Sequence, residues 1–178
     1  MSGQFLRTGS ILLLFTSLAL LVSACGQQPA GQGGAQAAPA SMESPSSEEQ
    51  LAEFKAAIRE KYDMKEQAFR DNNPEPILTR FYTESVISTD PEGNTKVGRV
   101  ALAPVYDEVI GSLVKIESYN TFVNGDAGWD WVNFHVSFPP GVEEEPFTFK
   151  MLFLWERIDG EWWSHGEMYV LGEFALKG

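Results

Sequence analysis

Residues 155–162 read Trp-Glu-Arg-Ile-Asp-Gly-Glu-Trp, and this stretch decides the fold. Asp159-Gly160 is a dipeptide typical of two-residue hairpin turns, whose central residues need positive φ angles. Long runs rich in β-branched and aromatic residues flank it, over residues 147–158 and 161–170. The pattern therefore predicts two long antiparallel strands joined by a tight turn.

Two further runs of the same kind precede this hairpin, at residues 114–123 and 129–138. Asn124-Gly125-Asp126 joins them, and a Pro-Pro-Gly turn followed by an acidic loop leads into the next strand. We expect a four-stranded antiparallel meander. Several of its strands are apolar on both faces, so we expect one face to pack on helices and the other on a second copy, forming a homodimer.

Upstream of the meander, the residue spacing predicts three helices and a small hairpin. The helices are expected at residues 47–73, 75–82 and 99–110, the first capped by Ser47 and the second opened by Pro74. The apolar stripe of the first helix is Leu51, Phe54, Ile58, Tyr62, Lys65 and Phe69. The hairpin strands are expected at 85–90 and 95–97, around the turn Asp90-Pro91-Glu92-Gly93.

The order helix, helix, hairpin, helix and four long strands resembles the NTF2-like fold, in particular its SnoaL-like and ketosteroid-isomerase-like members. The likeness covers residues 50–172. It is carried by Phe81-Tyr82-Thr83-Glu84, Asp90-Pro91-Glu92-Gly93, Gly98-Arg99 and the closing hairpin. The resemblance implies an α+β cone: three N-terminal helices packed on a strongly curved, mostly antiparallel sheet around an apolar pocket.

The resemblance also places Asp90 where ketosteroid isomerase has its general base. The open alternative is that Asp90 only begins a type I turn, for which Asp-Pro-x-Gly is well suited. The isomerase's oxyanion-hole tyrosine falls near Lys65 or Glu66, and its aspartic acid falls at Leu154, which cannot donate a hydrogen bond. We therefore do not expect steroid isomerisation by that mechanism.

His165, Glu167 and Tyr169 alternate along the last strand, so they are expected to share one face. The resemblance turns that face toward the pocket and sets the last strand beside the first, near Asp90. These groups would form either an acid–base site or a structural cluster of ion pairs and hydrogen bonds. We expect the pocket to be lined by Tyr62, Tyr82, Tyr106, Phe134, Leu154 and Tyr169.

Two other groups of residues have both a functional and a structural interpretation. His135, His165 and Glu167 have the composition of a metal-binding triad, but the two histidines lie on strands that should not be adjacent, so we expect no metal and no cofactor. The five tryptophans could cage a ligand, although packing is their commoner use on strands.

The N-terminus resembles that of bacterial lipoproteins. Arg7, a short apolar run and Val22-Ser23-Ala24-Cys25 form a signal peptide with a lipobox, which implies cleavage after residue 24 and acylation of Cys25. Residues 25–47 are rich in Gln, Gly, Ala, Pro and Ser and predict a disordered tether, followed by one domain over 48–178. We expect attachment to the bacterial cell envelope. If the cell has two membranes, we expect the outer membrane, facing the periplasm, because Gly26 stands directly after the cysteine, where an Asp commonly marks lipoproteins that are retained at the inner membrane.

Charge excludes one class of partner. Without residues 1–24 the chain has 12 basic and 25 acidic side chains, so it offers no basic surface for nucleic acid. Two functions stay open. The first is a lipid-anchored, non-catalytic domain that binds a small apolar or amphipathic ligand. The second is an isomerase, dehydratase or cyclase that uses Asp90 as base with His165 or Glu167.

Overall fold

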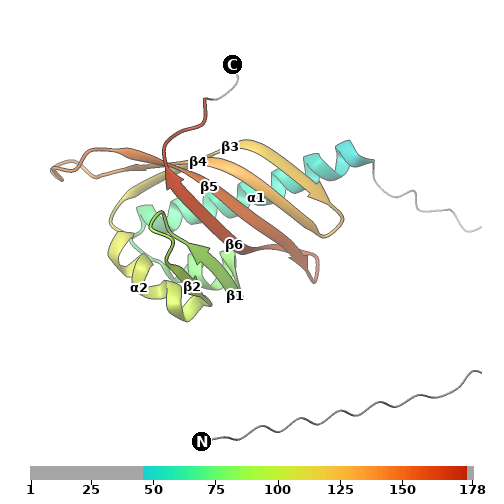
Figure 1. The fold of residues 1–178 in the computed structure, drawn as a ribbon, viewed down its shortest axis with the longest axis horizontal. Coiled ribbons are helices and arrows are strands. Elements are labelled where there is room, and N and C mark those ends of the chain that lie inside the picture. Colours follow the sequence, from blue (N-terminus) through green and yellow to red (C-terminus); the bar gives the residue numbers. More distant parts are fainter. Residues whose placement is uncertain (1–45, 176–178) are drawn as a thin grey trace, which may run out of the picture. The chain divides into compact units, whose positions relative to one another are not determined.

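The computed structural model describes residues 46–175, and the predicted signal peptide, the lipidation site and nearly all of the tether lie outside them. The elements are α1 (Ser47–Arg70), η1 (Ile77–Phe81), β1 (Tyr82–Thr89), β2 (Thr95–Val97), α2 (Arg99–Val109), β3 (Leu113–Asn124), β4 (Ala127–Ser137), β5 (Phe147–Ile158) and β6 (Glu161–Leu171). One sheet contains all six strands in the order β2-β1-β6-β5-β4-β3 (Figure 1).

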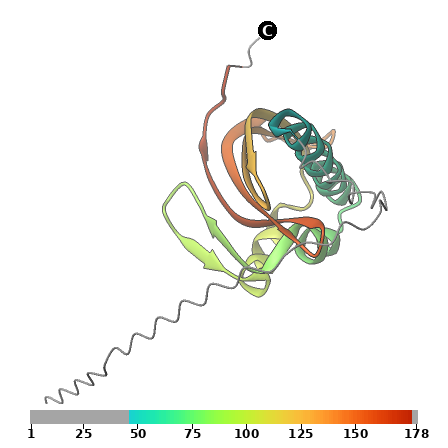
Figure 2. The same cartoon turned by 90° about the vertical axis from the view of Figure 1, so that its right-hand side faces the viewer.

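The four predicted long strands form the expected antiparallel meander, and the predicted contact between the first and last strands is confirmed, with β1 parallel to β6. The sheet curls strongly, with the helices on its concave side (Figure 2). The domain therefore has the predicted α+β architecture. None of the helices in the described part is long and apolar enough to span a membrane.

Helix α1 begins with a capping box, in which the Ser46 hydroxyl accepts from Glu49 N–H and the Glu49 carboxylate accepts from Ser46 N–H. The cap is thus Ser46 rather than the predicted Ser47, because only Ser46 has a glutamate three residues later. The helix ends at Arg70, shortly before Asn72, which has a φ of 52°. Helix α1 therefore begins at Ser47, the last residue of the predicted tether.

The second helix lies at residues 75–81, close to the predicted 75–82, but most of it is not α-helical. Residues 77–81 form a single π-helical turn, η1, and the strand starts at Tyr82, three residues earlier than expected. Both Phe81 and Tyr82 are fully buried. Packing of these two rings against the core ends the helix, which residue spacing alone does not show.

Side chains of α1 cover the backbone of the edge strand β3. Arg59 donates to the carbonyl oxygen of Ile116 (2.6 Å), and Glu66 accepts from Ile116 N–H (2.9 Å). Unpaired edge groups are otherwise open to other strands. These contacts fix α1 along the sheet.

The chain after β6 covers part of the outer, convex face of the sheet. The backbone of Phe174 forms two hydrogen bonds with the buried amide of Asn133, and its ring stacks on Tyr119 at 4.4 Å. Other apolar side chains of that face stay exposed, namely Ile87, Leu154, Met168 and Val170.

Candidate functional site

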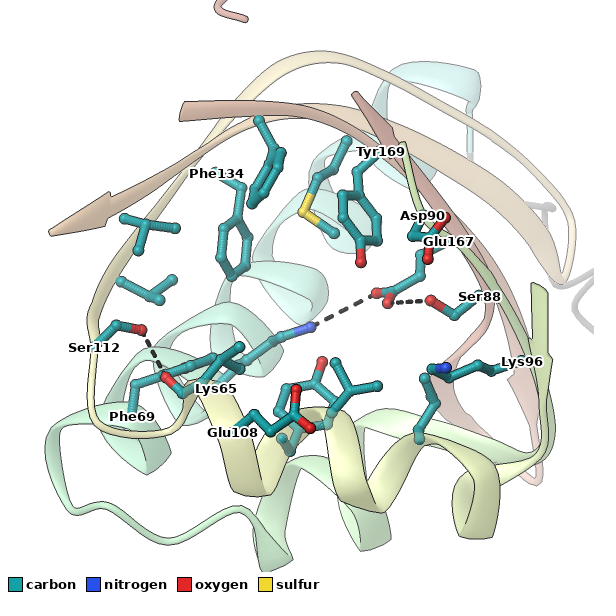
Figure 3. A pocket seen from close by; sticks show the side chains of 18 of the residues that line it. Lys65, Phe69, Ser88, Asp90, Lys96, Glu108, Ser112, Phe134, Glu167 and Tyr169 are labelled. Carbon is teal, nitrogen blue, oxygen red and sulfur yellow. Dashed lines mark hydrogen bonds and ion pairs between the residues drawn. The ribbon is translucent and has the colours of Figure 1, made fainter. Parts of the chain in front are cut away.

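A cavity of about 360 Å³ lies between α1, α2 and the concave face of the sheet (Figure 3). Half of its wall is apolar: Phe69, Leu102, Val105, Val109, Val114, Phe134, Val136, Phe147, Phe149 and Met151. Small-molecule sites combine such a wall with a few oriented polar groups. The polar groups here are gathered at the inner end and at the rim.

At the inner end, four elements bring five polar side chains together. Tyr82, at the start of β1, is the centre: its hydroxyl accepts from Lys65 Nζ of α1 (2.6 Å) and donates to Glu167 Oε2 of β6 (2.5 Å). Because Tyr82 has one hydroxyl hydrogen, the Tyr106 hydroxyl of α2 must donate to it (2.5 Å). Ser88 donates to the other Glu167 oxygen (2.9 Å). The carboxylate is thus held by two donors.

Lys65 lies on the cavity wall with only 1% of its surface exposed. Its Nζ is 3.8 Å from Glu167 Oε2, too far for a hydrogen bond, so among the described residues it donates only to Tyr82. Two of its three N–H groups therefore have no oxygen acceptor there. Nζ lies instead 4.3–5.6 Å from the centres of five rings, those of Phe81, Tyr82, Phe153, Tyr106 and Phe134.

Burial sets the protonation of this cluster. It lowers the pKa of Lys65 to about 8, and the nearby Glu167 carboxylate limits the shift. Burial, and then the Glu167 charge, raise the pKa of Tyr82 and of Tyr106 well above the ordinary value. Both phenols are therefore neutral donors at physiological pH, beside a lysine that can lose its proton near that range.

Asp90 lies at the cavity rim, and its carboxylate accepts hydrogen bonds from residues of the turn that it begins. Oδ1 accepts from the backbone N–H groups of Glu92 (3.1 Å) and Asn94 (2.8 Å), and Oδ2 accepts from Asn94 Nδ2 (3.0 Å). These hydrogen bonds lower the pKa of Asp90, and the bond from the Asn94 side chain has the largest effect. Gly93 N–H closes the predicted turn on the Asp90 carbonyl. A carboxylate with a lowered pKa is a weak base, which favours the turn interpretation.

The expected facing of His165 is wrong because β6 contains an irregularity. Its pairing with β5 passes from Leu154–Gly166 to Trp155–Ser164, so His165 is an extra residue. An extra residue reverses which face the following side chains occupy.

As a result, His165 points outward while Glu167 and Tyr169 point inward. The His165 ring is about half exposed and lies 3.8 Å from Glu156 on the convex side. Tyr169 lines the cavity, and burial raises its pKa to about 12. Only Glu167 of the two predicted partners of Asp90 therefore faces the cavity.

Leu154 also lies on the convex face, with 44% of its surface exposed, and not on the pocket wall as expected. Its neighbours Phe153 and Trp155 point inward. The implied alignment is thus shifted by one residue, because the position that it matches to the isomerase's aspartic acid faces outward and its two neighbours face inward. The inward positions on either side of Leu154 are aromatic.

The other expected pocket residues divide into two groups. Tyr106 and Phe134 line the cavity. Tyr62 and Tyr82 are fully buried behind its wall. Tyr62 donates to Asp130 (3.0 Å), a buried carboxylate that also accepts from two other hydroxyls and whose pKa is raised by burial.

His135, His165 and Glu167 do not converge. His135 is at the outer side of β4, where its ring contacts Thr148 and Glu117. Within residues 46–175, no three His, Cys, Asp or Glu side chains are grouped as metal ligands. No tryptophan lines the cavity. Trp155 and Trp162 are buried in the core.

The sequence interpretation did not place Lys65 on the cavity wall. Its position in the apolar stripe of α1 was the available signal, because a lysine on the buried face of a helix is rarely left without a partner. The implied alignment had placed the isomerase tyrosine near this residue.

The fold agrees with that of several solved structures. A protein of unknown function from Mycobacterium tuberculosis has 17% identity and a TM-score of 0.61, over 71% of this chain and 76% of that one. A ketosteroid isomerase-like protein from Erwinia carotovora atroseptica has 19% identity and a TM-score of 0.56, over 70% and 98%. An NTF2-like protein of unknown function from Pseudomonas putida has 16% identity and a TM-score of 0.57, over 66% and 86%.

The domain has an NTF2-like fold. No protein-family model matches the sequence, and a search of curated proteins finds no significant match. At these identities the NTF2-like likeness describes the architecture alone, and the fold hosts many activities. Function must therefore be argued from the cavity.

Proposed function

We propose that this NTF2-like domain binds one small, largely apolar molecule, and that an oxygen of that molecule accepts a hydrogen bond from Lys65. The observation that carries the proposal is the unmatched hydrogen-bonding capacity of Lys65 Nζ on a cavity wall of which half the residues are apolar. An oxygen acceptor would supply what the protein does not, while the apolar part of the ligand buries the rest of the cavity.

Methyl hexyl ketone is a suitable probe, because its alkene isostere, with CH₂ in place of the carbonyl oxygen, keeps the shape and removes the acceptor. We expect the ketone to bind at least tenfold more tightly, since a hydrogen bond to a charged donor contributes about 1.5–3 kcal/mol. Isothermal titration calorimetry with both compounds measures this ratio. Equal affinities would contradict the role of Lys65.

The chain offers a matched pair of variants for locating the bound molecule. Val109 lines the cavity and is partly exposed on α2, so Val109→Trp should block the cavity. Val100 lies on the same helix, is 90% exposed and is remote from the cavity wall, so Val100→Trp is the control. Ketone binding should be lost in the first variant and kept in the second. Loss in neither would place the ligand elsewhere.

A second candidate function is acid–base catalysis, in which Glu167 replaces Asp90 as the base. The observation that favours it is the carboxylate of Glu167 beside an ammonium and two phenols in an apolar cavity. Isomerases, dehydratases and cyclases can all begin by removing a proton next to a carbonyl group. NMR of methyl hexyl ketone in heavy water tests this: the protein should accelerate deuterium exchange at the positions beside the carbonyl, and Glu167→Gln should not.

Lipid anchoring belongs to the same proposal. It is supported by Val22-Ser23-Ala24-Cys25 and by the Pro-, Gly- and Ala-rich stretch behind it. An acylated Cys25 would hold the domain close to a membrane of the cell envelope, where apolar molecules are abundant. For a cell with two membranes, Gly26 favours the outer one.

Homodimerisation is the remaining part of the proposal. It is supported by the exposed apolar side chains Ile87, Leu154, Met168 and Val170, which share the convex face of the sheet. An apolar patch of this kind on one face is typical of an interface between subunits.

A further inference from the structure

Lys65 combines features that are seldom found on one lysine. Nζ lies on the cavity wall, 3.8 Å from the Glu167 carboxylate (Figure 3). It is also 2.6 Å from the Tyr82 hydroxyl, and five aromatic rings surround it. Lys55, the exposed lysine of the same helix, does not line this cavity. A lysine in a desolvated pocket can act as a nucleophile toward carbonyl compounds.

We propose that Lys65 Nζ condenses reversibly with the carbonyl carbon of an aldehyde or ketone held in the cavity, forming a protonated imine. This inference rests on the proposed function, because it uses the same cavity and the same ligand oxygen. It adds the chemical class of the ligand and the bond that retains it.

The condensation needs no reagent beyond the chain and the ligand. The ammonium of Lys65 first passes a proton through Tyr82 toward Glu167, and its lone pair then forms the carbon–nitrogen bond. The carbonyl oxygen takes up that proton and then a second one from the nitrogen, and the carbon–oxygen bond breaks to release water. One ammonium and one carbonyl group thus give one iminium ion and one water, with no change in charge or oxidation state.

The site suits the iminium product because the reaction keeps the positive charge on the Lys65 nitrogen. Glu167 faces a cation before and after condensation, and the five rings stabilise an iminium as they do an ammonium. The burial of Lys65, of which only 1% is exposed, also limits the access of water, which would hydrolyse the imine. With its pKa lowered to about 8, roughly one Lys65 in ten is neutral at pH 7, against fewer than one in a thousand for an ordinary lysine.

Borohydride reduction tests the proposal, since it converts an imine into a stable secondary amine. The purified protein is mixed with an equimolar amount of octanal at pH 7, reduced and digested, and the modified lysines are identified by peptide mass spectrometry. We expect Lys65 to be modified at least tenfold more than Lys55. In guanidinium chloride the preference should vanish, because it depends on the folded site.

The variants Lys65→Met and Lys55→Met are matched controls on one helix. The first should abolish the preferential product, and the second should leave it unchanged. Since Lys65→Met leaves Glu167 unpaired, the double variant Lys65→Met/Glu167→Gln serves if the single variant does not fold.

Displacement of Nile red by octanal separates the failure of this inference from failure of the proposed function. Displacement without preferential reduction at Lys65 would overturn the imine and leave the binding proposal intact. Neither displacement nor reduction would overturn both. Modification of Lys65 and Lys55 at equal rates in the folded protein would also overturn the imine.

Discussion

Replacing Lys65 by methionine tests whether Lys65 and Glu167 form a coupled buried pair. The variant removes the ammonium 3.8 Å from Glu167 and the 2.6 Å hydrogen bond to Tyr82. Removing one partner of a buried ion pair costs about 3–5 kcal/mol, because the other charge is left uncompensated. Methionine fills the space and contacts the five rings favourably, so we expect a loss of about 3 kcal/mol in the free energy of unfolding.

The partner variant Glu167→Gln should cost about 2 kcal/mol, since it breaks the same pair and leaves hydrogen-bond donors without their carboxylate. The double variant has neither charge, so we expect it to lose only about 2–3 kcal/mol, well below the sum of the two. Urea unfolding, followed by tryptophan fluorescence that includes the buried Trp155 and Trp162, measures the free energy of unfolding of the wild type, the two single variants and the double variant.

The control is Lys55→Met, an exposed position on the same helix, which should change stability by under about 0.5 kcal/mol. If the losses of the two single variants simply add in the double variant, the two side chains are not coupled. A neutral Lys65→Met would likewise refute the reasoning.

Four further predictions concern pH, the rim, the outer face and the anchor. The pKa of Lys65 falls from 10.5 to about 8 on folding, so the unfolded chain binds more protons than the folded protein between these pH values. The free energy of unfolding should therefore rise by about 2 kcal/mol from pH 8 to pH 10, relative to that of Lys65→Met. Urea titrations of the two proteins that show the same pH dependence would contradict this prediction. Asp90→Asn keeps the turn's hydrogen bonding and should change stability by under about 0.5 kcal/mol and leave ketone affinity unchanged by calorimetry; a large loss of affinity would restore Asp90 as a functional group. Met168→Glu should convert a dimer into a monomer in light scattering, whereas a monomeric wild type would rule the dimer out. Cys25→Ala should leave the protein unprocessed or soluble on membrane fractionation, and processed, membrane-bound protein would refute the anchor.

The sequence was sufficient for the sheet because its strands are long and their turns are distinctive. Asp159, with a φ of 52°, and Gly160, at 83°, adopt the positive φ values that their turn requires. The strands Thr95–Val97 and Phe147–Ile158 have the predicted bounds. Local patterns of this kind survive folding because the turn and the alternation of residues specify the same register.

The site was less predictable because it depends on single-residue details. The irregularity at His165 has one weak marker in the sequence, the neighbouring Gly166 inside the strand, and it decides which residues of β6 face the cavity. Lys65 appeared only as one position in an apolar stripe, and its partners Tyr82, Tyr106 and Glu167 come from three other elements. Contacts between distant elements of this kind are set by tertiary packing.

The NMR signal of the Lys65 side-chain nitrogen, identified by its loss in Lys65→Met, reports most directly on a ligand oxygen at the inner end of the cavity. We predict that titration with methyl hexyl ketone shifts this signal saturably, with the same affinity as calorimetry, and that the alkene isostere shifts it much less. An unchanged Lys65 signal while the ketone binds, or no ketone binding at all, would contradict the account.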